Sequence, residues 1–236
     1  MRVARWFLAL VAGALLLGPA AADELTGKYQ ATGATPQGKP YSGEVQIEQL
    51  GGLHVILWKL ADGEAYKGLG IRQGDVLGAA YGPADTKFGI VVYRVNGGTL
   101  TGLWADSRDL KSELGKETLE GDPNLTGTYK ITLGQNRDGL TNYAGQVQIK
   151  RSGESYIVVW PTKPPAIGVG VRLKDLLVVA YTNNPRKMPG VVAYQALGSD
   201  ALSGIWSIAG IKQSGDSSFN ITAPSKVGRE DLKRVP

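Results

Sequence analysis

Eight aromatic residues recur as matched pairs and are the side chains best suited to bind a ligand. Aromatic rings that point into a β-barrel can line a pocket, with tyrosine hydroxyls and indole N–H groups orienting the bound molecule. The alternative is that these rings fill a narrow barrel as its core, which short strands favour. Both interpretations stay open for the pairs Tyr41 and Tyr143, Trp58 and Trp160, Tyr93 and Tyr194, and Trp104 and Trp206.

The usual residues of catalysis and metal binding are scarce. The chain has no cysteine, and His54 is its only histidine, with Tyr156 at the matching position of a repeat described below. A histidine-based metal site needs several convergent ligands, so a structural role is expected for His54. No G-x-S-x-G nucleophile motif is present. We therefore expect neither an enzyme nor a metal or other cofactor.

Carboxylates leave one catalytic alternative open. Asp75 and Asp175 are matched acids, but both stand where hairpin turns are predicted, and aspartate at such positions bonds local backbone groups. The other acids, such as Glu44, Glu64 and Glu117, show no acidic counterpart. A hydrolase of carbohydrates or esters, with carboxylates that converge only in three dimensions, about 5–10 Å apart, is the competing hypothesis.

The elements that position these residues come from a tandem duplication. Tyr41-Ser42-Gly43-Glu44-Val45-Gln46-Ile47 returns as Tyr143-Ala144-Gly145-Gln146-Val147-Gln148-Ile149. In each copy apolar and polar residues alternate, which is typical of a strand with one buried face. Other landmarks recur with offsets of 100 to 102 positions, and Asp122-Pro123 lies at the seam.

Turn residues recur about every 8–12 positions, which predicts an all-β meander of about eight strands per copy. In the first copy these strands are expected at 27–33, 41–49, 53–60, 65–72, 75–81, 88–95, 99–105 and 115–120. The fold prediction is two tandem small antiparallel barrels, with a sandwich as runner-up. The predicted units are a first barrel at 23–121, a second barrel at 122–223 and a disordered tail at 224–236.

Several predicted strands are apolar on both faces. In the third strand, Leu53, Val55 and Leu57 lie on one face, opposite His54, Ile56 and Trp58, and the fifth and sixth strands are similar in both copies. A small barrel should leave its outer face in water, so these strands need a second cover. We expect the two copies to pack on each other, or a homodimer to cover the same strands.

The ordered motifs G-x-Y, Y-x-G-x-V-x-I, W, G-x-G, G-V-V-Y and L-x-G-x-W occur in each copy, with small departures. In this order they resemble a family of small exported bacterial β-proteins, some of which are labelled fibronectin-binding. The resemblance implies a β fold and an extracytoplasmic location. Its motifs are structural, so it carries no functional residue to this chain.

Residues 1–22 have the order of a secretory signal peptide. Arg2 and Arg5 precede the apolar run 8–17, and small residues at 20–22 supply a cleavage site. Its removal lowers the net charge from +5 to +3, with 24 basic against 21 acidic residues, and the basic residues are scattered. We therefore expect a periplasmic or secreted protein that binds no nucleic acid. Short strands with charged outward positions also disfavour a membrane-spanning barrel after cleavage.

Together these features predict an exported, non-catalytic binding or structural protein. Its partner is expected to be a small apolar ligand or an extracellular protein.

Cleavage near Ala22 and export of the mature chain are the first testable outcome. Mass spectrometry of the exported protein should find a chain that begins near Asp23. An exported chain that retains Met1 would contradict the prediction.

Overall fold

The computed structural model describes residues 24–110, 113–214 and 218–236, and every regular element in them is a β-strand. The predicted signal peptide lies outside the described residues. None of the described residues belongs to a helix long and apolar enough to cross a membrane. The first nine strands are β1 (Gly27–Ala34), β2 (Pro40–Leu50), β3 (Leu53–Leu60), β4 (Ala65–Gln73), β5 (Val76–Gly82), β6 (Gly89–Asn96), β7 (Thr99–Asp106), β8 (Gly115–Glu120) and β9 (Gly127–Gln135).

The second half continues with a similar series and one additional hairpin. Its strands are β10 (Gly145–Ser152), β11 (Ser155–Trp160), β12 (Ala166–Leu173), β13 (Leu176–Thr182), β14 (Gly190–Ala196), β15 (Ala201–Ile208), β16 (Gly210–Ser214), β17 (Ser218–Thr222) and β18 (Gly228–Arg234). The eight strands predicted for the first copy all occur within two residues of their expected bounds.

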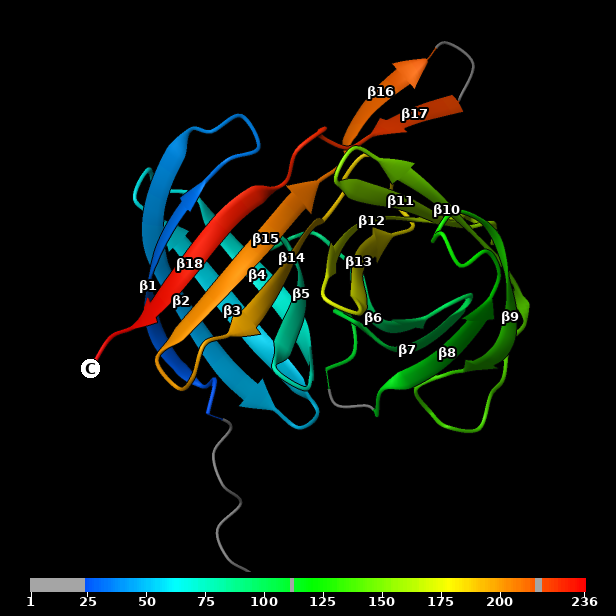
Figure 1. The fold of residues 1–236 in the computed structure, drawn as a ribbon, viewed down its shortest axis with the longest axis horizontal. Coiled ribbons are helices and arrows are strands. Elements are labelled where there is room, and N and C mark those ends of the chain that lie inside the picture. Colours follow the sequence, from blue (N-terminus) through cyan, green and yellow to red (C-terminus); the bar gives the residue numbers. More distant parts are fainter. Residues whose placement is uncertain (1–23, 111–112, 215–217) are drawn as a thin grey trace, which may run out of the picture.

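The strands close into two antiparallel barrels of eight strands each, which confirms the predicted fold class (Figure 1). The first barrel has the order β1-β18-β15-β14-β5-β4-β3-β2, and the second has the order β10-β11-β12-β13-β6-β7-β8-β9. Closure leaves neither barrel with a free edge strand.

The barrels do not follow the two sequence copies, which corrects the predicted boundaries. Each barrel takes five strands from one copy and three from the other: β5 pairs with β14, and β13 pairs with β6. The strands β6 and β14 begin with the equivalent segments Gly89-Ile90-Val91-Val92-Tyr93 and Gly190-Val191-Val192-Ala193-Tyr194. Because either strand can satisfy either neighbour, local sequence does not distinguish pairing within a copy from exchange between copies.

The predicted disordered tail is wrong for residues 228–234. These residues form β18, which pairs with both β1 and β15 and so closes the first barrel (Figure 1). Gly228, Glu230 and Leu232 are buried, whereas Arg229, Asp231 and Lys233 are exposed. The alternation was difficult to recognise because only one of the three buried residues, Leu232, has a large apolar side chain.

The additional hairpin β16–β17 separates β15 from β18 and forms its own two-stranded sheet. In Figure 1 it projects beside the second barrel. The segment that follows it rests on the turn between β10 and β11. The backbone N–H of Glu154 donates to the carbonyl of Ser225, and the N–H of Val227 donates to the Glu154 carboxylate at 2.9 Å.

An apolar layer joins the two barrels, as the doubly apolar strands predicted. Its buried members come from both barrels and include Leu69, Ile71, Ile90, Val92, Val169, Val171, Val178 and Val191. At the centre, a Cβ added to Gly78 would lie 2.8 Å from methyl groups of Val178 and Val92, so only glycine allows this approach. The third strand contributes less than expected: Leu57 is 38% exposed and Val55 is only half-buried. The fourth strand of each copy takes its place.

A pair of engineered cysteines tests the exchange in the full chain. Val76 lies opposite Gln195 on neighbouring strands, where Cα spacing suits a disulfide. Val76→Cys with Gln195→Cys should therefore cross-link on mild oxidation, measured as a loss of two thiols.

The matched control is the double variant Val76→Cys with Arg94→Cys. Arg94 lies in the same sequence copy as Val76 and corresponds to Gln195 of the other copy. Packed sheets stand about 10 Å apart, which is beyond the reach of a disulfide. Cross-linking of the control instead of the test pair would contradict the exchange.

Candidate ligand-binding site

The eight predicted aromatic residues gather into two groups, one inside each barrel. The exchange decides the membership, because each group combines residues of both copies. The first barrel holds Tyr41, Trp58, Tyr194 and Trp206, and the second holds Tyr143, Trp160, Tyr93 and Trp104. Each group surrounds one buried glutamate.

Glu230 on β18 is the centre of the first group and is 4% exposed. Its Oε1 accepts hydrogen bonds from the hydroxyl of Tyr194 and from the indole Nε1–H of Trp58, the latter at 3.1 Å. Its Oε2 accepts a bond from the hydroxyl of Tyr41 at 3.0 Å. Trp206 stands edge-on to the Tyr41 ring, with centroids 6.2 Å apart.

Glu117 on β8 repeats this geometry in the second barrel and is 3% exposed. Its Oε1 accepts bonds from the Tyr93 hydroxyl and from Trp160 Nε1 at 3.3 Å, and its Oε2 accepts from Tyr143 at 3.0 Å. Trp104 lies edge-on to Tyr143 at 6.4 Å. The two clusters are therefore chemically equivalent.

The interpretation of Glu117 as an acid without a counterpart is wrong. The segment Gly115-Lys116-Glu117-Thr118-Leu119 returns as Gly228-Arg229-Glu230-Asp231-Leu232. The offset is 113 instead of 102 because the hairpin β16–β17 is inserted before β18. A comparison that allowed an insertion would have found the match, and with it both buried carboxylates.

Burial changes the proton affinity of both glutamates. Desolvation raises the pKa of Glu230 and of Glu117, and the hydrogen bonds from their tyrosine and tryptophan partners oppose that shift. Burial and the neighbouring carboxylate likewise raise the pKa of Tyr194 and of Tyr93 well above the ordinary tyrosine value. Both tyrosines therefore remain hydrogen-bond donors over the physiological range.

Among the residues that the structure describes, the first cluster faces a large cavity and the second does not. This cavity has a volume of about 600 Å³ and opens at one end of the first barrel. Its lining includes the whole first cluster together with Tyr66, Tyr81, Val192, Ile208, Leu60, Lys39, Asp62 and Glu64. The first barrel is therefore a cup with Glu230 in its wall.

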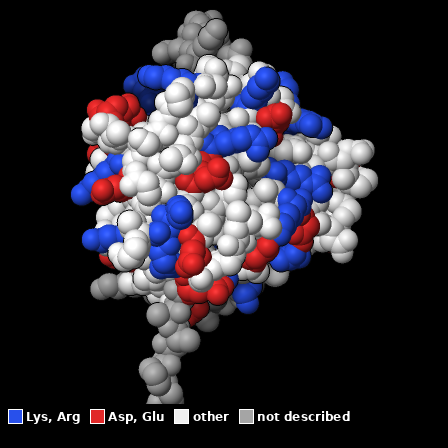
Figure 2. All heavy atoms as spheres, turned by 60° about the vertical axis from the view of Figure 1, so that its left-hand side comes forward, with Lys and Arg blue, Asp and Glu red and all other residues white. Residues whose placement is uncertain are grey.

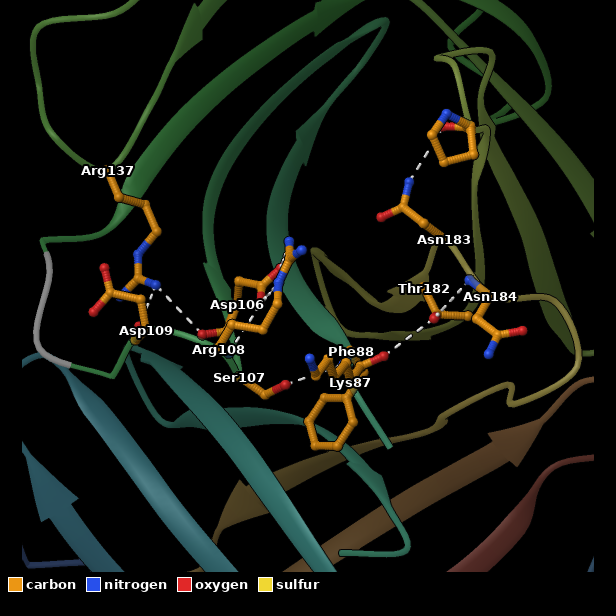
Figure 3. A network of polar contacts seen from close by, with 11 residues as sticks. Lys87, Phe88, Asp106, Ser107, Arg108, Asp109, Arg137, Thr182, Asn183 and Asn184 are labelled. Atoms are coloured by element: carbon orange, nitrogen blue, oxygen red, sulfur yellow. Dashed lines mark hydrogen bonds and ion pairs between the residues drawn. The ribbon is translucent and has the colours of Figure 1, made fainter. Parts of the chain in front are cut away.

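The corresponding end of the second barrel is covered by polar groups. Arg137, in the loop between β9 and β10, is buried; its Nε–H donates to the carbonyl of Glu113 at 2.9 Å, and Nη1 donates to that of Asp109. Arg108 forms a bidentate pair with Asp106 at 2.8 and 2.6 Å. Figure 3 shows these groups on one side of the barrel and Asn183 on the other.

A smaller cavity of about 300 Å³ lies at this cover. It is lined by Tyr181 and by charged residues such as Asp85, Lys87, Asp106, Arg108 and Lys187, and by no member of the Glu117 cluster. The second cluster does not reach this cavity and serves as packed core. The first cluster, in contrast, faces a cavity that can admit a ligand.

Two loop differences explain why one barrel is open. The β1–β2 connection at 35–39 is shorter than the β9–β10 connection at 136–144, which carries Arg137. Conversely, β3 continues two residues past Trp58, whereas β11 ends at Trp160, so the β3–β4 hairpin extends further. Its turn at 61–64 supplies Asp62 and Glu64 to the rim. The matching β11–β12 segment, 161–165, contains Lys163 and three prolines but no acid.

One aromatic residue of the cup has no equivalent in the second barrel. Tyr66 pairs with Trp58 across β3 and β4, and Ala166 occupies the same register opposite Trp160. The Tyr66 ring stands edge-on to Tyr81 at 5.6 Å, and its hydroxyl donates to Glu64. Burial and this carboxylate raise the pKa of Tyr66 to about 12.

The other residues considered for chemistry lie apart from the cup. His54 is buried on β3, and among the described residues no group of histidine, cysteine and acids could hold a metal ion. Asp75 lies in the β4–β5 turn, at the end of β4 opposite Tyr66, and pairs with Lys174. Asp175 lies in the matching turn and pairs with Arg94. Both aspartates thus lie in turns, as expected, and each pairs there with a basic residue of a distant segment.

The raised glutamate pKa values predict a pH dependence of stability. Between the unfolded and folded pKa values, the native state binds more protons than the unfolded chain, so the free energy of unfolding falls as pH rises through that window. Glu117→Gln and Glu230→Gln remain neutral and should each remove part of this slope. One of three donors would lose its acceptor, at a cost of about 1–3 kcal/mol at low pH.

Urea unfolding between about pH 4.5 and 8 measures the effect. Glu44→Gln, on the exposed face of β2, is the control and should keep the parental slope. Equal slopes in all four proteins would contradict the assignment.

Trp58 and Trp160 should both stabilise the folded protein by packing, in addition to donating hydrogen bonds to Glu230 and Glu117. Truncation of either to alanine should cost about 3–5 kcal/mol in unfolding free energy. Trp58→Phe should cost less, because it keeps most of the ring and loses the bond to Glu230. Unchanged melting of both alanine variants would contradict a structural role.

No protein-family model and no curated protein matches this chain at a significant level.

Proposed function

We propose that this chain is an exported, non-catalytic binding protein whose small-molecule ligand enters the cup of the first barrel. The observation that carries the proposal is the contrast between equivalent clusters: within the described part of the chain, the Glu230 cluster lines a large open cavity and the Glu117 cluster does not. A volume of about 600 Å³ lies within the range of small-molecule sites, which are mostly apolar with a few placed polar groups. The cup has this composition.

The geometry around the acids supports binding over hydrolysis. Both oxygens of Glu230 are engaged by three donors from Tyr194, Trp58 and Tyr41, so this carboxylate is held as an acceptor. Glu64 is engaged by Tyr66. A glycoside-cleaving pair would need one acid free to donate a proton and another free to attack or to activate water. The hydrolase alternative therefore receives less support than binding.

The surface supports a small ligand better than a nucleic acid. On the face seen in Figure 2, lysines and arginines are interspersed with aspartates and glutamates. Nucleic-acid binding requires basic side chains gathered on one face. The second barrel, in this proposal, acts as a closed twin that supports the first through the shared apolar layer.

The neutral fluorescent probe N-phenyl-1-naphthylamine tests the proposal, because its emission rises when it leaves water. The mature chain should bind one equivalent. Leu60→Trp, at the cup lining, and Tyr66→Ala, which introduces the residue of the second barrel, should each weaken binding at least tenfold while the protein stays folded.

Thr162→Trp is the matched control, since the exposed Thr162 follows Trp160 by two residues as Leu60 follows Trp58. It should leave binding unchanged. Absence of binding, or binding lost only in the control, would overturn the proposal.

A further inference from the structure

We propose that the ligand of the cup is an organic cation, a substituted ammonium group on an apolar body. This inference rests on the proposed function and specifies its ligand class. It follows from the aromatic lining, from the charges at the rim and from the way the second barrel covers the matching position.

Six aromatic rings line the cup: Tyr41, Trp58, Tyr66, Tyr81, Tyr194 and Trp206. The faces of such rings attract cations, and aromatic cages are the usual site for substituted ammonium groups. Trp58 and Tyr66 both pack against Tyr81, each with centroids 5.6 Å apart. These three rings form a continuous aromatic wall that runs from Trp58, in the Glu230 cluster, to Tyr66 beside the rim acids.

The charges of the lining favour the same class. Asp62, Glu64 and Glu230 line the cup against a single lysine, Lys39. The two rim acids belong to the longer β3–β4 hairpin and lie beside Tyr66, to which Glu64 is bonded. A cation at the rim would therefore meet carboxylates and ring faces together, while an anion would meet three acids.

The second barrel places its own cations at the matching end. Burial raises the pKa of Tyr181, the counterpart of Tyr81, whereas Arg108 and Arg137 lie near enough to act against that shift. In the first barrel, by the offset of the matched tryptophans, Gly210 corresponds to Arg108 and Ile208 to Asp106. As far as the structure describes it, the cup lining contains no arginine, whereas its twin is covered by the buried Arg137 and by the more exposed Arg108, which is paired with Asp106. An external cation can take the place of these arginines in the cup.

A competition assay with two isosteric molecules tests the ligand class. Benzyltrimethylammonium and neopentylbenzene have the same shape, but only the first is charged. Each is titrated against mature protein loaded with N-phenyl-1-naphthylamine at low ionic strength. The cation should displace the probe at least tenfold more effectively, and added salt should reduce its advantage.

The variant Asp62→Asn/Glu64→Gln should reduce the ratio of the two displacement constants, cation over neopentylbenzene, at least fivefold; the ratio is measured within the variant, so that a change in its affinity for the probe cancels. Glu44→Gln/Glu48→Gln, on the exposed face of β2, is the matched control and should keep the preference. Equal displacement by both molecules, or a preference unaffected by the rim variant, would overturn the cationic class while leaving the cup as a binding site. Failure of the mature protein to bind any of the three molecules would overturn the proposed function itself.

Discussion

The exchange of strands between the two sequence copies is the constraint on which the rest of this structure depends. Because β5 pairs with β14 and β13 pairs with β6, neither barrel can close without residues from both halves of the chain. The same pairings bring Tyr194, Trp206 and Glu230 to the barrel that contains Tyr41 and Trp58. The apolar layer around Gly78 and Val178 then fixes the barrels against each other. Fold, core and cup are thus consequences of one pairing choice.

Much of this could be predicted from local pattern, and the remainder depends on long-range choices. Alternation and turn spacing located the eight strands of the first copy, since both are properties of a few neighbouring residues. The matched aromatics were singled out by their recurrence and fall into two equivalent clusters, but the sequence alone left core and ligand contact open for all eight. The sequence could not decide whether β6 or β14 pairs with β5, because both strands offer equivalent apolar residues. Glu230 was missed since an inserted hairpin displaced its match to Glu117.

Duplication has produced two versions of one polar core, and loop length determines their different roles. A glutamate held by two tyrosines and a tryptophan is costly to bury, and in both barrels its hydrogen bonds offset that cost. In the second barrel, the longer β9–β10 loop brings Arg137 over the end, and charged residues cover the position. In the first, a shorter loop and a longer acidic hairpin leave a cup with Tyr66 at its wall. In the proposed function, the closed copy supports the scaffold while the open copy binds the ligand.

The central claim is that the first barrel, and only the first, receives the ligand. The tryptophan indole N–H resonances of the ¹⁵N-labelled mature chain test it most directly, because Trp58 and Trp206 line the cup while Trp104 and Trp160 belong to the closed twin. Titration with benzyltrimethylammonium should shift the signals of Trp58 and Trp206 in a saturable manner and leave the other two in place. Saturable shifts confined to Trp104 and Trp160, or equal shifts at all four, would contradict the account.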